Sequence, residues 1–150
     1  MEVTSTVAIV YIMSLFASLY AAWAIGSNDV ANSIGPLASI VSVIKNNAIP
    51  LKTEVPLFVL IIGGVGIVIG LLTFGYKVIY TIGQKITELT PSRGFSAEFA
   101  TATLVLTFSK LSIPISTTHT IVGAVIGVRY ARGIAALNLS IIKDIALSWI

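Results

Sequence analysis

The sequence has no cysteine, a single histidine and very little charge. Without cysteine it has no disulfide, no thiolate metal ligand and no thiol nucleophile. One histidine without surrounding carboxylates argues against a zinc or di-iron site, and no nucleophile–base pair is visible, so we do not expect an enzyme. Charged residues make up 10% of the chain and hydrophobic residues 56%, whereas soluble domains carry roughly 25% charged residues. This composition predicts an integral membrane protein.

The net charge of +3 does not indicate nucleic acid as a partner. The lysines and arginines stand between apolar segments, where basic residues set membrane orientation. They are not interleaved with aromatic residues along one stretch. The expected surroundings are therefore a lipid bilayer.

Alternating apolar and polar stretches predict an all-α fold, a polytopic bundle of membrane helices formed as a single unit over residues 1–150. The approximate apolar segments are 4–25, 29–44, 55–76, 95–109, 117–128 and 141–150. About 20 apolar residues cross a bilayer, so 4–25 and 55–76 each predict a crossing. Residues 29–44 form a second crossing or a re-entrant half-helix.

The two segments 95–109 and 117–128 are too short to span and predict half-helices on either side of a polar break. Residues 141–150 look like the start of a further span. Residues 77–98 are the most polar part of the chain and predict an amphipathic interfacial helix, followed by a turn at Thr90–Gly94.

The segment 4–25 also has features of a signal peptide, with small residues at Ala21, Ala22 and Ala24. A signal peptide begins with a basic region, and no lysine or arginine precedes this apolar run. We therefore favour a membrane span over a cleaved signal.

The stretch from Gly26 to Pro36 contains Asp29, the only charged residue between Glu2 and Lys45. A carboxylate inside an apolar membrane segment is costly and indicates a functional site by default. Gly26 to Asn28 is expected to interrupt the helix, with Asn28 or Ser27 capping the next segment, and Pro36 is expected to kink it.

Three side chains of this stretch suit a hard cation. Asp29 and Asn32 are three residues apart and so share a helical face, and Asn28 at the break can point the same way. Their oxygens fit Na⁺, with Asp29 as the candidate metal ligand.

A second polar break follows Pro114, where Ser116, Thr117 and Thr118 stand at an expected helix start. Free N–H groups and the positive end of the helix dipole attract an anion there. Single hydroxyls in membrane helices often only bond to neighbouring helices, and His119 is expected to be such a partner rather than a proton relay. Two interrupted apolar segments nevertheless point to a transporter site.

Three motifs resemble those of the inorganic phosphate transporter (PiT) family, the sodium- or proton-coupled phosphate permeases. They are Gly26–Pro36, Gly83–Gly94 and Pro114–Thr120, in the family's order. The resemblance implies secondary active transport of inorganic phosphate coupled to Na⁺ or H⁺, with no cofactor beyond the co-transported ion. It implies that Asn28, Asp29 and Asn32 line the substrate and cation site. It also implies that Ser116, Thr117 and Thr118 hold phosphate oxygens.

The resemblance further implies one half of an inverted-repeat transporter, and the motifs look like those of the second half. The other half is expected on the same longer chain or in an antiparallel homodimer. We favour the longer chain, because the last apolar segment ends before it could cross. The expected location is the plasma membrane. The alternative is a non-transporting membrane subunit, or an inactive fragment of a transporter, whose breaks only pack against partner helices.

Asp29 suggests a mechanism as a hypothesis. A bound Na⁺ or proton offsets its charge, and its carboxylate accepts a hydrogen bond from a protonated phosphate oxygen near the membrane midplane. Sulfate has no such proton at neutral pH and would meet an unpaired carboxylate, which disfavours the wrong anion.

Overall fold

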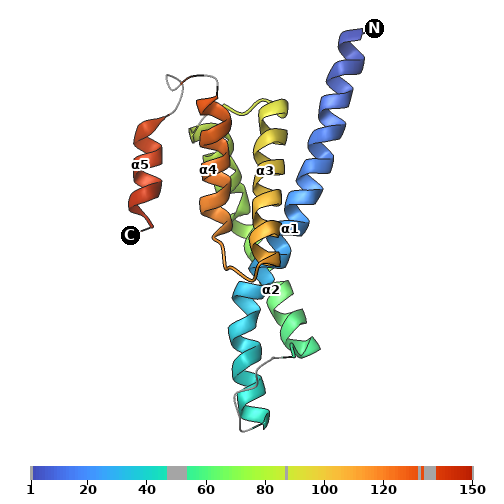
Figure 1. Cartoon of the computed structure of the whole chain (residues 1–150), viewed down its shortest axis with the longest axis vertical. Coiled ribbons are helices and arrows are strands. Elements are labelled where there is room, and N and C mark those ends of the chain that lie inside the picture. The colour runs from blue at the N-terminus through green and yellow to red at the C-terminus, as the bar shows by residue number, and fades with distance from the viewer. Residues whose placement is uncertain (1, 47–53, 87, 132, 134–137, 150) are drawn as a thin grey trace.

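The computed structural model describes residues 2–46, 54–86, 88–131, 133 and 138–149. The described part is helical and contains no strand, which confirms the predicted all-α class (Figure 1). Its elements are α1 (Glu2–Asn46), α2 (Leu57–Tyr80), the π-helical η1 (Thr81–Ile86), α3 (Pro91–Lys110), α4 (Thr117–Tyr130) and α5 (Leu139–Leu147).

The first two predicted segments form one unbroken helix, so the expected interruption at Gly26–Asn28 is wrong. The helix α1 has 45 residues, and Pro36 lies inside it. Ser27 does not cap a new helix, because its Oγ donates to the Ala24 carbonyl at 2.8 Å within the same turn. Asn28 does not cap one either, because its side chain bonds to a segment far along the chain. Tertiary contacts therefore override the local breaking signal of Gly26.

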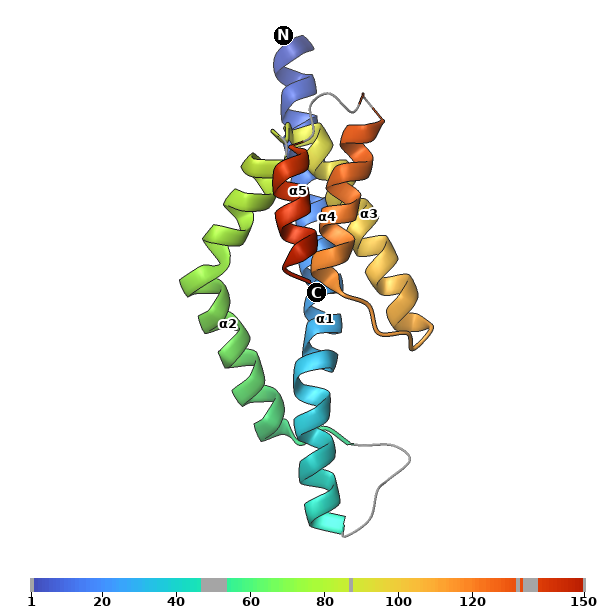
Figure 2. The same ribbon diagram turned by 90° about the vertical axis from the view of Figure 1, so that its left-hand side faces the viewer.

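The helix α2 runs back along the molecule from the C-terminal end of α1 and bows away from it in mid-course (Figure 2). The two helices meet at Gly63, where an added Cβ would lie 2.5 Å from side-chain atoms of Ile34. By length and hydropathy two described stretches are long and apolar enough to cross a membrane, Ser5–Asn46 and Leu57–Ile86. Large apolar side chains on α2 are exposed, as expected for a lipid-facing helix.

The expected amphipathic helix over 77–98 is not present as one element. Its first part continues α2 into η1, and its last part is the beginning of α3. Thr90–Gly94 is not a turn: Thr90 is the N-cap of α3 and Pro91 opens the helix, a position where its missing N–H costs nothing.

The helices α3 and α4 form an antiparallel hairpin joined by residues 111–116, which we call the hairpin tip. The helix α3 starts at Pro91, four residues before the predicted half-helix, and α4 has 14 residues. Both views show α3 lying along the N-terminal half of α1 (Figures 1 and 2). Ser14 Oγ donates to the Pro91 carbonyl at 3.1 Å, and Ser109 Oγ donates to Asn28 Oδ1 at 3.4 Å. Because both residue numbers increase together, α1 and α3 run parallel.

Small side chains let α1 and α3 approach closely. Ala21 and Ala24 pack against Ala102 and Val105 with almost no exposed surface. In membranes, small residues at a helix interface allow backbones to come near one another. This alanine-lined interface determines the position along α1 at which the hairpin tip contacts it.

A second buried cluster holds the hairpin to the rest of the molecule. Ile86 of η1, Ala97 of α3, and Val122 and Val125 of α4 pack together. Three isoleucines of α5 cover this cluster, Ile141, Ile142 and Ile145. The predicted final segment 141–150 thus appears as α5, nine residues long, packed on the hairpin.

Candidate functional site

The hairpin tip lies against the middle of α1, and Asn28 is the main point of contact. Its side chain is 5% exposed. Its Nδ2 donates to the Ile115 carbonyl at 3.2 Å, and its Oδ1 accepts from Ser109 Oγ at 3.4 Å. A buried carboxamide is costly unless its donors and acceptors are paired. Asn28 therefore anchors the tip while its own polar groups are satisfied.

Asp29 is half-buried beside Asn28 and contacts the first residue of α4. Its Oδ1 accepts from Thr117 Oγ1 at 3.3 Å and from Asn28 Nδ2 at 3.3 Å. In the part of the chain that the structure describes, Oδ2 has no hydrogen-bond donor. A carboxylate offers about four acceptor positions, so this second oxygen can bind a cation or a protonated ligand.

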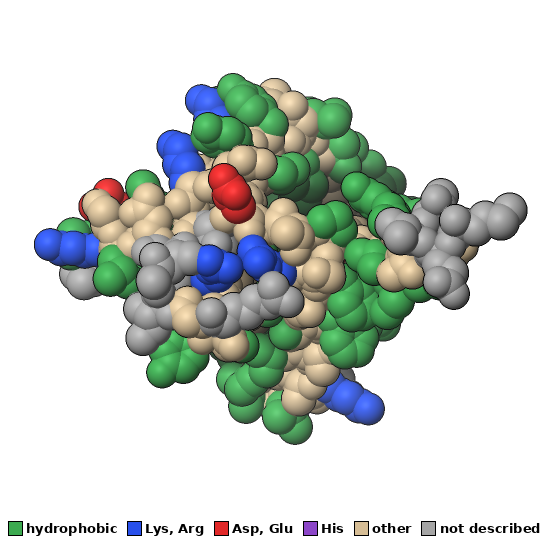
Figure 3. Space-filling view, turned by 90° about the horizontal axis from the view of Figure 1, so that it is seen from above, with side chains coloured by type: hydrophobic (Ala, Val, Ile, Leu, Met, Phe, Trp, Pro, Cys, Tyr) green, Lys and Arg blue, Asp and Glu red, His purple; other side chains and the backbone are tan. Residues whose placement is uncertain are grey.

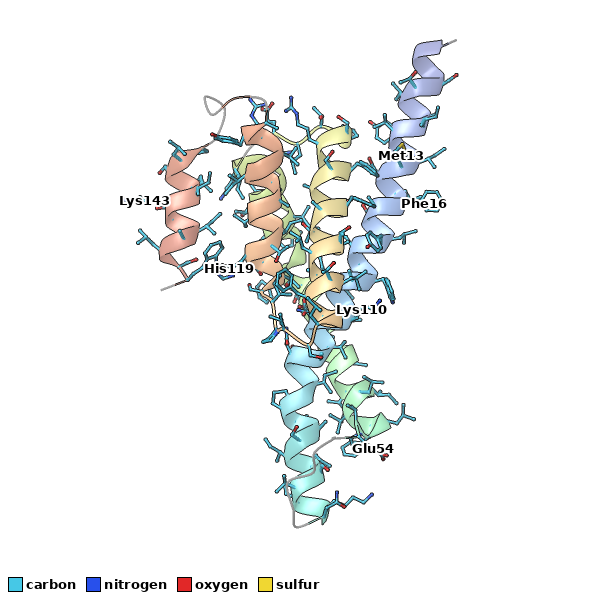
Figure 4. All side chains as sticks on the ribbon, in the orientation of Figure 1. Met13, Phe16, Glu54, Lys110, His119 and Lys143 are labelled. Atoms are coloured by element: carbon cyan, nitrogen blue, oxygen red, sulfur yellow. The ribbon has the colours of Figure 1, made fainter. Side chains whose placement is uncertain are left out.

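The start of α4 provides N–H donors at the same place. Ser116 is the N-cap, and its Oγ accepts from the His119 N–H at 3.3 Å. His119 lies near the start of α4 (Figure 4). Its Nδ1 lies 2.5 Å from Ser116 Oγ, so the imidazole and the cap form one unit. The first N–H groups of a helix have no partner within it. Those of Thr117 and Thr118 therefore remain for an anion.

A groove of about 320 Å³ opens between α1 and the hairpin tip. It is lined by Ser27, Asn28, Ala31, Asn32, Ser109, Ser112, Ile113 and Pro114. A water takes up about 30 Å³ of liquid volume, so the groove has room for a small hydrated ion. Most of its polar lining consists of hydroxyls and carboxamides, which bind ions without adding charge.

Pro36 adds a backbone acceptor to this region. Proline has no N–H, so the carbonyl four residues earlier, that of Asn32, loses its usual helical donor. Asn32 is itself exposed and lines the groove. An oxygen freed in this way is a common ligand for Na⁺ in membrane transporters.

The structure connects three of the six predicted site residues directly, Asn28, Asp29 and Thr117. Asn32 shares the groove with Asn28. Ser116 bonds to His119, and Thr118 is exposed. The binding roles of all six stay predictions.

Other groups at the tip were not foreseen. Ser109 bonds to Asn28, the Ile115 carbonyl accepts from it, and Ser112 lines the groove with a positive φ of 58°. Ser109 was missed because it is one of many hydroxyls near the end of an apolar segment. A left-handed backbone at a serine gives no signal in the sequence.

The ring of Trp149 contacts His119, with centroids 3.6 Å apart. Trp149 lies two residues after the end of α5, so this contact brings the end of the described chain to the start of α4.

Comparison with known proteins shows which family the chain resembles. A family model described as the phosphate transporter family matches residues 2–150. A Pyrococcus furiosus protein named "putative phosphate permease" is 54% identical over 137 residues, which are 91% of this chain and 33% of that protein. The chloroplastic inorganic phosphate transporter 2-1 of Arabidopsis thaliana is 51% identical over 140 residues, 92% of this chain and 24% of the relative.

A solved structure described as the sodium-dependent phosphate transporter is similar with a TM-score of 0.80 and 46% identity. The match covers 91% of this chain and 34% of that one. The chain thus spans between about a quarter and a third of the length of these relatives.

Proposed function

Because this chain belongs to the phosphate transporter family, we propose that it forms one repeat of a secondary transporter that carries inorganic phosphate with Na⁺. One observation supports this most directly: the hairpin tip brings Thr117 and the start of α4 to Asp29 in the middle of α1. Donors for an anion and oxygens for a cation therefore lie side by side.

The anion half of the proposed site is the start of α4. Phosphate oxygens accept from the free N–H groups of Thr117 and Thr118 and from the exposed Thr118 hydroxyl. The Ser116 hydroxyl joins them when it turns away from His119. None of these groups carries a full charge, so the anion is held without the strong attraction that would slow its release.

The cation half is the Asp29 carboxylate with the Asn32 carbonyl and carboxamide. Na⁺ is the proposed ion, because the solved relative is described as sodium-dependent. Without a bound cation Asp29 would repel phosphate, and this dependence links the two ions. A proton on Asp29 would provide the same neutralisation, and the experiment below separates the two.

The remaining part of the transporter is proposed to come from a second repeat on the same longer protein, because the matched relatives are about three times as long as this chain. An antiparallel pair of identical chains is the alternative source. We propose the plasma membrane as the location, since a sodium-driven symporter needs a membrane that holds a sodium gradient. A fluorescent fusion found only in internal membranes would contradict that location.

The test is uptake of radiolabelled phosphate into proteoliposomes by the protein expressed from its complete reading frame. We expect an inward Na⁺ gradient to drive accumulation, a proton gradient alone to drive little, and excess sulfate to compete poorly. Accumulation driven only by the proton gradient would reassign the coupling ion. No accumulation with either gradient, from protein that is folded and inserted, would favour the non-transporting membrane subunit.

A further inference from the structure

Two arginines lie at the base of the hairpin, the end opposite the tip. Ala97 of α3 packs with Val125 of α4 in the buried cluster. Arg93 lies one turn before Ala97 and Arg129 one turn after Val125. Residues four apart share a helical face, and the two helices are antiparallel, so both arginines reach the same end of the hairpin on neighbouring faces. We call Arg93 and Arg129 the arginine pair.

Each arginine has a buried donor without an acceptor. The Nε atoms of Arg93 and Arg129 are shielded from solvent and lack hydrogen-bond partners. The one side-chain bond that Arg93 makes runs from Nη1 to the Glu88 carbonyl, at 3.1 Å. No ion pair joins either guanidinium to a carboxylate within residues 2–46, 54–86, 88–131 and 138–149.

This arrangement is costly for the protein alone. Buried donors in native proteins are nearly always paired, so an unpaired one calls for a missing partner such as an ion. Both arginines are half-buried, and only their Nε atoms are fully shielded. Two unpaired Nε donors at the same end of the hairpin point to an anion that both guanidinium groups share.

The arginine pair is separate from the groove at the tip. Arg93 lies near the start of α3 and Ser109 near its end, about 24 Å apart at 1.5 Å per residue. The base faces the end of the molecule that Figure 3 looks down on, where Lys or Arg side chains adjoin one another near the middle of the face. A helix end of this kind belongs at the membrane surface rather than at its midplane.

We propose that the arginine pair binds a phosphate group. The planar guanidinium fork matches two oxygens of a tetrahedral oxyanion at once, which a lysine cannot do. Two sources supply such a group at this depth, the headgroup of an anionic phospholipid and free inorganic phosphate. The proposal needs only the chain's membrane location and is independent of the transport function.

The lipid arm of the test measures retention of phosphatidylglycerol by native mass spectrometry, on the delipidated protein expressed from its complete reading frame. We expect the Arg93→Gln/Arg129→Gln variant to bind phosphatidylglycerol about 25-fold more weakly, because each arginine near an anionic surface contributes about fivefold. Phosphatidylcholine serves as the neutral lipid. The matched control is Lys45→Gln/Lys110→Gln, which removes two exposed positive charges from other helix ends.

The free-phosphate arm measures equilibrium binding of radiolabelled phosphate in the Asp29→Asn background, which disables the tip. Phosphate binding that remains there and is lost with the arginine pair identifies free phosphate as the ligand. Phosphatidylglycerol retention lost with the pair, without such phosphate binding, identifies the lipid. Unchanged binding in both arms, or equal losses in the lysine control, would overturn the proposal.

A conservative variant guards against misfolding. Arg93→Lys/Arg129→Lys keeps both charges but loses the forks, and we expect it to fall between the wild type and the glutamine variant. Size-exclusion profiles of all variants report the folded state. An Arg93→Lys/Arg129→Lys variant that is monodisperse and binds as tightly as the wild type would contradict the role given to the guanidinium forks.

Discussion

The two ends of the α3–α4 hairpin carry their polar groups in opposite ways. At the tip, Asn28, Asp29 and Thr117 bond to one another across separate segments. At the base, Arg93 and Arg129 leave buried donors without protein partners. A site whose groups hold each other in place is ready to bind and release an ion many times. A site whose charges lack partners is suited to a ligand that stays.

The two proposed sites also differ in charge. At the tip site, Asp29 contributes a carboxylate among neutral hydroxyls and N–H groups, so an anion binds there only when a cation neutralises Asp29. At the base, the arginine pair contributes two positive charges and needs no co-bound cation to attract an anion. Binding at the tip is therefore coupled and reversible, and binding at the base is uncoupled.

The largest expected effect is that of Asp29→Asn at the tip. Removing the charge removes the proposed cation ligand while the shape is kept, so sodium-driven phosphate uptake should fall at least about 100-fold. Sulfate should compete better in any residual uptake, because the amide can donate to it. Proteoliposome uptake measures both quantities.

The matched change is Asp144→Asn on α5, an exposed carboxylate away from the tip. It should leave uptake within about twofold of the wild type, as is usual for exposed sites. Normal and still selective uptake by the Asp29→Asn variant would contradict the role given to this residue.

The next expected effect comes from the interface between α1 and α3, which determines where the hairpin tip contacts α1. Ala24 is fully buried between α1 and α3, so Ala24→Leu overpacks that interface at a cost of about 1–3 kcal/mol. The hairpin tip should shift away from Asn28, and both thermal stability and uptake should fall. Ala22→Leu, on an exposed position of the same helix, should change neither, and equal effects of the two would contradict this packing.

A smaller effect is expected from one hydrogen bond at the tip. Thr117→Val removes the hydroxyl that donates to Asp29 and keeps the shape, so phosphate affinity should fall about fivefold to tenfold. Thr117→Ser should restore most of it. Thr103→Val removes an exposed hydroxyl that bonds only within α3, and it should leave the affinity from binding assays unchanged.

The sequence was sufficient to predict the all-α membrane class, because hydropathy is a local property of the chain. It was also sufficient to single out Asp29, since a lone charge in an apolar run has a high cost wherever the run folds. The predicted helix interruption at Gly26–Asn28 was wrong, because contacts of α1 with α3 and the hairpin tip keep the helix continuous there.

Long-range pairing was out of reach of the sequence alone. Ser109 meets Asn28 across 81 positions of the chain, and nothing in either neighbourhood specifies that register. The arginine pair was missed for the same reason, because only the packing of Ala97 against Val125 aligns Arg93 with Arg129. The two buried clusters, rather than the sequence motifs, determine which of these residues lie near one another.

The most direct test of the central claim is protection by phosphate of a single cysteine at the start of α4. The chain has no native cysteine, and Thr118→Cys places a thiol at an exposed position where phosphate is proposed to bind. Thr103→Cys is its control, because Thr103 is an exposed threonine on α3 that bonds only within its own helix. We expect phosphate with Na⁺ to slow modification of Thr118→Cys by a small thiol reagent, and to leave Thr103→Cys unaffected. Equal modification rates with and without phosphate at Thr118→Cys, in protein that still takes up phosphate, would contradict the site at the hairpin tip.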